Sequence, residues 1–177
     1  MRSLIALLVA IAGFASVPAV AELPVGAKAP VFVAATAKAG KAGRFNLAKA
    51  LQKGPVVLYF YPKAFTQGCT LEAHAFAEAT DDFARAGATV LGMSADDLAT
   101  LKRFSVEACR DKFAVGVASP KVIAAYDVAM GSSGMTNRTS YVIGQDGRVA
   151  FVHSDRDYRE HVSRTLAAVK AMQAARP

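Results

Sequence analysis

Residues 55–62, PVVLYFYP, are the clearest indicator of the fold class. β-branched and aromatic residues follow one another there without a charge, as expected of a strand covered on both faces in a parallel sheet. After a short loop, a helical pattern runs from about residue 69 to residue 86 and ends at Gly87. A buried strand followed by a helix is the repeating unit of an α/β fold.

Further strands and helices alternate after this unit. We predict strands at 88–93, 113–118, 139–143 and 148–153, and helices from Asp96 or Asp97 to 110, over 120–126 and over 159–173. The turn Gln145-Asp146-Gly147 predicts a hairpin between the last two strands. Short apolar runs at 31–33 and 45–47 predict two short strands near the N-terminus. The fold class that we expect is α/β, with a central mixed sheet flanked by helices.

The first residues have the pattern of a secretory signal peptide. Arg2 precedes an apolar stretch over 4–17, and Ala19-Val20-Ala21 forms a small-residue cleavage site. We therefore expect residues 1–21 to be a signal peptide, residues 22–177 to form a single domain, and the protein to be periplasmic. No later segment approaches the length of a membrane helix, so we expect no membrane association after cleavage.

The basic charge of the chain does not indicate nucleic-acid binding. The formal net charge is +7, but the Lys and Arg residues are spread along the chain. A nucleic-acid site needs a basic stripe or a known motif, and neither is visible. We expect a solvated basic surface.

The chain has two cysteines, Cys69 and Cys109. In an oxidising compartment such a pair usually forms a disulfide, which is either a permanent structural bond or part of a catalytic cycle. The histidines and cysteines show no paired ligand spacing, so no metal site is predicted.

Cys69 lies directly after the buried strand and a turn, at the start of a helix. Helix N-termini and nearby cations favour the thiolate form of a cysteine, which is the nucleophile. Cys69 is therefore a candidate reactive thiol, and the alternative is a small buried apolar residue in the first helical turn.

The segment YPKAFTQGCTLE, residues 61–72, resembles the active-site segment of the peroxiredoxins, where a Pro-x-x-x-Thr-x-x-Cys pattern holds the peroxide. The Gly-Cys-Thr-x-Glu sequence is similar to the bacterioferritin-comigratory protein or PrxQ subfamily. The resemblance continues through 90–95, 139–147 and the closing helix. It implies a thioredoxin-like fold and a thiol-dependent peroxidase that needs no metal, flavin or haem cofactor.

The resemblance also implies roles for single residues. Cys69 would be the peroxidatic cysteine, which a peroxide oxidises to a sulfenic acid. Pro62 would shape the pocket, the hydroxyl of Thr66 would bind the peroxide, and Arg138 would stabilise the thiolate and the charge that develops as the O–O bond breaks. Glu72 matches a family position, but an acid in the first turn of a helix is also ordinary capping chemistry.

The resolving cysteine departs from the commonest subfamily pattern. That pattern has a cysteine five residues after the peroxidatic one, where this chain has His74. Some members carry the resolving cysteine on a later helix, so Cys109 is the candidate resolving residue. The disulfide with Cys69 would then be reduced by a thioredoxin-like or other thiol reductant. The alternative is that Cys109 is a packed small residue. The subfamily resemblance also suggests a monomer.

Two other functions compete with a peroxidase. A periplasmic thiol–disulfide oxidoreductase shares the fold but normally carries Cys-x-x-Cys, whereas Cys69 is followed by Thr70-Leu71-Glu72. A non-catalytic module with a permanent Cys69–Cys109 bridge is the other alternative. His153 and His161 are expected to be surface or partly packed histidines without a catalytic role.

Overall fold

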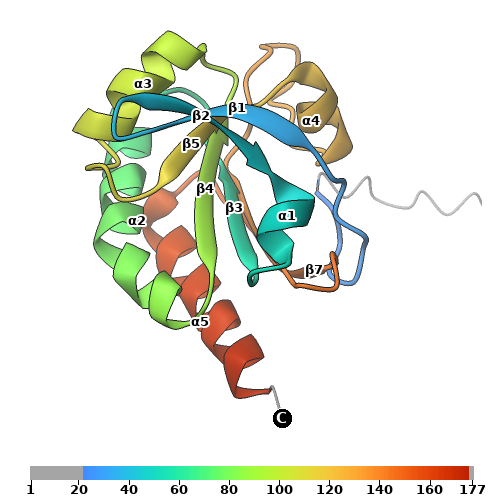
Figure 1. Cartoon of the computed structure of the whole chain (residues 1–177). Coiled ribbons are helices and arrows are strands. Elements are labelled where there is room, and N and C mark those ends of the chain that lie inside the picture. Colours follow the sequence, from blue (N-terminus) through green and yellow to red (C-terminus); the bar gives the residue numbers. More distant parts are fainter. Residues whose placement is uncertain (1–21, 176–177) are drawn as a thin grey trace, which may run out of the picture.

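A computed structural model of the chain describes residues 22–175 (Figure 1). The predicted signal peptide, residues 1–21, lies outside the described residues. The seven strands are β1 (Val33–Lys38), β2 (Lys41–Asn46), β3 (Val56–Phe60), β4 (Thr89–Ser94), β5 (Ala114–Val117), β6 (Thr139–Ile143) and β7 (Val149–Ser154). The helices are α1 (Leu47–Leu51), α2 (Gln67–Arg85), α3 (Leu98–Glu107), α4 (Pro120–Ala125), a short 3-10 turn η1 (Tyr158–Glu160) and α5 (His161–Ala174).

The strands form one mixed sheet in the order β2-β1-β5-β4-β3-β6-β7. β3, β4 and β5 run parallel to one another, whereas β1, β2, β6 and β7 pair antiparallel with their neighbours. All five residues of β3 are buried. The strand predicted from residues 55–62 is therefore confirmed, in the interior of the predicted mixed sheet between β4 and β6.

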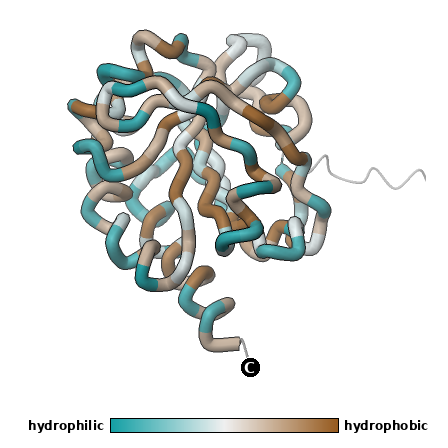
Figure 2. The backbone as a smooth tube through the Cα atoms, viewed as in Figure 1, coloured by the Kyte–Doolittle hydropathy of each residue, from teal (hydrophilic) through white to brown (hydrophobic). Residues whose placement is uncertain are grey.

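Helices cover both faces of the sheet (Figure 1). α2, α3 and α5 pack on the face that carries Val57, Tyr59 and Val142. α1 and α4 pack on the opposite face, which carries Val56, Leu58 and Phe60. Figure 2 shows hydrophobic residues concentrated in the central strands and hydrophilic residues on the outer helices and turns. Alternate residues of β3 therefore contribute to two separate cores.

Several helix and turn predictions are confirmed by their local chemistry. The Asp97 side chain accepts a 2.8 Å hydrogen bond from the Thr100 backbone N–H and caps α3. Ser119 caps α4, with Pro120 as the first helical residue. Gly147, at φ 75°, turns the chain between β6 and β7.

The N-terminal prediction was wrong in its boundaries. The structure has a β1–β2 hairpin in place of separate strands at 31–33 and 45–47, and it adds α1. Ala39 and Gly40 form the two-residue turn, both with positive φ. β2 is largely exposed and reads KAGRFN, so it lacks the apolar alternation that marks a strand.

Within residues 22–175, no helix combines the length and the apolar character needed to cross a bilayer.

Candidate active site

The loop between β3 and α2 is held from two sides. The backbone N–H of Ala64 donates a 2.8 Å hydrogen bond to the Asp96 carboxylate, which also accepts from the Ser94 hydroxyl at 2.8 Å. The Thr136 hydroxyl donates to the Tyr61 carbonyl oxygen at 2.7 Å. Sequence reasoning treated Asp96 as a possible helix cap, but Asp97 is the cap and Asp96 anchors this loop.

Cys69 is the third residue of α2 and is 2% exposed. Thr66 stands at the N-cap position, but its hydroxyl donates to the Lys63 carbonyl oxygen at 3.0 Å and makes no capping hydrogen bond to the helix. The first turn of a helix carries a partial positive charge, which favours an anion such as a thiolate. The sulfur therefore lies where the backbone itself supports negative charge.

Arg138 directly precedes β6 and brings its guanidinium to the sulfur. Nη2 donates to Cys69 Sγ at 3.4 Å, Nη1 pairs with the Glu72 carboxylate, and Nε donates to the Arg156 carbonyl oxygen at 3.0 Å. Burial lowers the pKa of Arg138, but Glu72 and Cys69 outweigh it, so the pKa is raised overall. The predicted proximity of Arg138 to Cys69 is present in the structure.

A glycine leaves space for this arrangement. A Cβ on Gly68 would lie 3.4 Å from Arg138 Nη2 and 3.8 Å from the Tyr158 ring. Any side chain larger than a methyl group would therefore compete with the guanidinium for the space beside Cys69.

Glu72 does not act as a capping residue. It is fully buried, one carboxylate oxygen pairs with Arg138, and the other has no hydrogen-bond partner. Burial raises the pKa of Glu72 from 4.5 to about 8, and Arg138 opposes this only in part. Glu72 and Cys69 thus share one cation.

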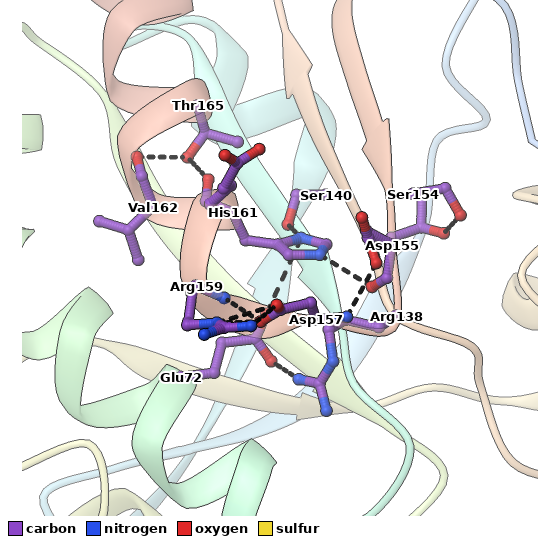
Figure 3. Close-up of polar contacts among 12 residues, drawn as sticks. Glu72, Arg138, Ser140, Ser154, Asp155, Asp157, Arg159, His161, Val162 and Thr165 are labelled. Atoms are coloured by element: carbon purple, nitrogen blue, oxygen red, sulfur yellow. Dashed lines mark hydrogen bonds and ion pairs between the residues drawn. The ribbon is translucent and has the colours of Figure 1, made fainter.

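His161 is buried more deeply than the surface or partly packed position that the sequence predicts. The side chain is fully buried, with Nδ1 2.8 Å from Ser140 Oγ, Nε2 3.0 Å from the Asp155 carbonyl oxygen, and Nδ1 3.8 Å from Glu72 (Figure 3). A carbonyl oxygen can only accept, so Nε2 carries the proton. Burial lowers the pKa of His161 from 6.5 to about 4, which keeps the ring neutral at neutral pH. His161 therefore lies as a neutral, buried ring beside the Glu72 carboxyl group.

The other predicted site residues that lie close to Cys69 along the chain are more exposed than it. Pro62 is half-buried and Thr66 is exposed, both in the loop that precedes Cys69. His74 is half-buried on α2.

Cys109 lies in a turn, not in the helix predicted to reach residue 110, because α3 ends at Glu107. Its side chain is fully buried in the same apolar cluster as Cys69, and both cysteines are free thiols. Burial raises the pKa of the Cys109 thiol, with Asp111 adding to the effect. In this conformation Cys109 is therefore a neutral thiol without access to solvent.

Sequence reasoning missed Ser140, Asp96 and the buried role of His161. Of these three residues, Ser140 alone had a local sequence signal of a buried polar contact, because it is a polar residue inside the buried strand TSYVI. Buried hydroxyls are normally hydrogen-bonded, so this position implied a polar partner of unknown identity.

Among residues 22–175 there is no group of three or more His, Cys, Asp or Glu side chains that could hold a metal ion.

Comparisons with known proteins point to one family. Residues 25–152 match the model of the AhpC/TSA family. The chain is 32% identical over 120 residues to the chloroplastic peroxiredoxin Q of Oryza sativa subsp. japonica, covering 67% of this chain and 55% of that protein. It is also 32% identical over 155 residues to the chloroplastic peroxiredoxin Q of Suaeda salsa, covering 86% of this chain and 71% of that protein. The chain thus spans about half the length of the rice relative.

Among solved structures, the peroxidoxin BcpB from Mycobacterium tuberculosis is similar with a TM-score of 0.75 and 31% identity. The similarity covers 84% of this chain and 97% of that one. The sheet and its helices thus have the thioredoxin-like arrangement that the sequence predicted.

Proposed function

Because the chain belongs to the AhpC/TSA family of peroxiredoxins, we propose that it is a thiol-dependent peroxidase that reduces hydrogen peroxide and organic hydroperoxides at Cys69. The observation that carries this proposal is the 3.4 Å contact between Arg138 Nη2 and Cys69 Sγ at the first turn of α2. Reactive cysteines typically lie beside a cation or at a helix N-terminus, and the sulfur of Cys69 has both a buried guanidinium and the first turn of α2 beside it.

The chemical step follows from this geometry. The Cys69 thiolate attacks one peroxide oxygen, the O–O bond breaks, and the sulfur becomes a sulfenic acid. The other oxygen leaves as hydroxide or alkoxide and takes up a proton to become water or an alcohol. Arg138 stabilises the negative charge as it moves from sulfur to the leaving oxygen. Thr66 and Pro62, in the adjoining loop, bind the peroxide and limit access of water.

The second half of the cycle uses Cys109 as the resolving residue. Its thiol condenses with the Cys69 sulfenic acid to give a disulfide and water, and a thioredoxin-like or other thiol reductant restores both thiols. Because both cysteines are buried, the turn that carries Cys109 and the first turn of α2 must open to bring the sulfurs together.

The proposal includes the cellular location and the oligomeric state of the protein. We infer that residues 1–21 direct export and are removed, and that residues 22–177 act in the periplasm as a monomeric single domain. No nucleic acid or membrane takes part in the cycle that we propose.

Peroxide consumption by the reduced mature protein tests the proposal, with Cys69→Ser and Cys109→Ser as variants and thiol states followed by mass spectrometry. We expect turnover with a dithiol reductant in the unsubstituted protein and none in Cys69→Ser. Cys109→Ser should complete one oxidation and stop at the sulfenic acid. If all three proteins are inert and a disulfide persists in reductant, the chain is a non-catalytic module. If the protein exchanges disulfides but leaves peroxide intact, it is an oxidoreductase.

A further inference from the structure

An aromatic contact joins the loop before Cys69 to α3. The ring of Phe65 meets that of Phe104 edge-on, with centroids 5.2 Å apart and an angle of 86°. The Arg103 guanidinium lies 5.1 Å from the centroid of the Phe65 ring. Phe65 is 39% exposed, whereas Phe104 is fully buried and stacked on Tyr61. One partly exposed ring thus lies between the active-site loop and the end of α3.

Phe104 in turn holds the turn that contains Cys109. Its carbonyl oxygen accepts backbone N–H hydrogen bonds from Ala108 and from Cys109, both at 3.0 Å. The position of the Phe104 backbone therefore fixes the position of Cys109. A continuous set of contacts runs from the Cys69 loop through Phe65 and Phe104 to the second thiol.

The backbone is strained at both ends of this set of contacts. Phe65 has a φ of 64°, and Arg110 and Asp111, directly after Cys109, have φ values of 49° and 60°. Non-glycine residues in this left-handed region are strained and need their surroundings to hold them there. A backbone hydrogen bond from the Asp111 N–H to the Ser105 carbonyl oxygen at 3.0 Å also holds the turn to α3. Its links to α2 are two exposed ion pairs, Arg110–Glu78 at 3.2 Å and Lys112–Asp81 at 3.6 Å, which stabilise little.

Oxidation of Cys69 adds an oxygen atom where space is short. The sulfur is 2% exposed and contacts Arg138, and even a Cβ on Gly68 would lie 3.4 Å from that guanidinium. Closely packed interiors accommodate added atoms by moving the backbone. The loop that contains the strained Phe65 has no regular structure and leads directly into the first turn of α2, which carries Cys69.

We propose that Phe65 is a positioning residue that keeps Cys109 buried in the reduced protein and releases it when the loop before Cys69 moves. The inference rests on the proposed function. When the loop shifts, the Phe65 ring leaves Phe104, the end of α3 loosens, and Cys109 becomes accessible. The Cys109 thiolate then attacks the Cys69 sulfenic sulfur: the S–S bond forms, the S–O bond breaks, and the departing hydroxide takes the proton that Cys109 released to form water.

Alkylation of Cys109 by iodoacetamide, followed by mass spectrometry, tests this coupling without any peroxide chemistry. The Cys69→Ser background leaves Cys109 as the single thiol. We expect alkylation at least about tenfold faster in Phe65→Ala and Phe65→Gly than in the background, since both remove the ring. Phe65→Gly also relieves the left-handed strain, so it keeps the test valid if Phe65→Ala folds poorly.

Leu71→Ala is the matched control, because Leu71 is 41% exposed on the outside of α2 and contributes nothing to this set of contacts. It should leave the alkylation rate within about twofold of the background, and Arg103→Gln should raise the rate by a smaller factor than loss of the ring. Equal alkylation rates in the background and both Phe65 variants would overturn the proposal. So would a rate increase that merely follows global unfolding, measured by urea denaturation.

Failure of the Phe65 coupling can be distinguished from failure of the proposed peroxidase function. In the protein with both cysteines, Phe65→Ala should leave the rate of Cys69 oxidation within about threefold while Cys109 becomes reactive before peroxide is added. If peroxide is not consumed but Cys109 is released as expected, the peroxidase proposal fails and the coupling stands.

Discussion

The carboxylate of Asp96 accepts a hydrogen bond from the backbone N–H of Ala64 at 2.8 Å, across 32 positions of sequence. The loop that leads into Cys69 is therefore positioned by the end of β4, the strand next to β3 in the sheet. Ser94 donates to the same carboxylate oxygen and helps to fix its orientation.

Asp96→Ala should slow the oxidation of Cys69 by peroxide about tenfold, because a misplaced loop disturbs the reacting geometry. Asp96→Asn retains an acceptor oxygen and should recover most of the rate, measured by stopped flow. Asp97→Ala is the control: it removes the cap of α3 and should cost about 1 kcal/mol of stability without slowing the reaction. Equal rates for Asp96→Ala and the unsubstituted protein would show that the loop is held by other contacts.

Arg138→Lys should reduce the second-order rate constant for Cys69 oxidation by about 100-fold. Lysine keeps the charge but cannot reach Cys69, Glu72 and the Arg156 carbonyl at once, and loss of one donor to developing charge typically costs a factor of about 100 to 1,000. Arg148→Lys, at an exposed site on the β6–β7 turn, should leave the rate unchanged. A similar loss in both variants would point to a nonspecific charge effect.

The stability of the fold should decrease as the pH rises from about 6.5 to about 8. The pKa of Glu72 is raised in the folded state, so the folded protein binds this proton more tightly than the unfolded chain, and the stabilisation is lost as pH rises through about 8. Between about pH 4.5 and 6.5 the lowered pKa of His161 raises the stability as the pH rises, because the unfolded chain binds this proton more tightly, and this offsets the effect of Glu72. Urea denaturation should show a loss of at most about 2 kcal/mol above pH 6.5.

Glu72→Gln should remove that pH dependence, because an amide does not titrate. His161→Gln, which cannot be charged, should leave the decline above pH 6.5 in place and extend it down to about pH 4.5, because the opposing effect of His161 is then absent. A decline that persists in Glu72→Gln would assign the titration to another group.

Gly92→Ala should destabilise the protein by about 1–3 kcal/mol through overpacking. A Cβ at this position would lie 2.6 Å from the Tyr59 ring, which packs across the neighbouring strand. Adding Tyr59→Leu to Gly92→Ala should recover part of the loss, giving a coupling energy between the two sites. Gly43→Ala, where the Cβ would meet only Thr36 at 3.4 Å, is the control.

The sequence was sufficient for the central sheet because each of its elements carries a local signal. β3 is a continuous apolar run, α3 and α4 begin at capping residues, and the β6–β7 turn contains Asp-Gly. The β1–β2 hairpin gave a weaker signal, because β2 is largely exposed and only its end, at Phe45, packs against the core.

The candidate site could be predicted only as far as a linear motif extends. The motif gave Cys69, and the resemblance added Arg138. The burial of Glu72 and His161 arises where α2 packs against α5 and α5 packs against β6. Glu72 lies 66 positions before Arg138, so no local pattern could show this arrangement. The burial of Cys109 likewise depends on where α3 ends, and helix ends are the least predictable boundaries.

The placement of two tyrosines gives the redox state a spectroscopic signal. The chain contains five tyrosines and no tryptophan, and the buried rings of Tyr59 and Tyr61 share one apolar cluster with both thiols. Disulfides quench tyrosine emission at short range, so closure of the proposed Cys69–Cys109 disulfide should lower the intrinsic fluorescence. Successive turnovers could then be followed in real time in the unlabelled protein.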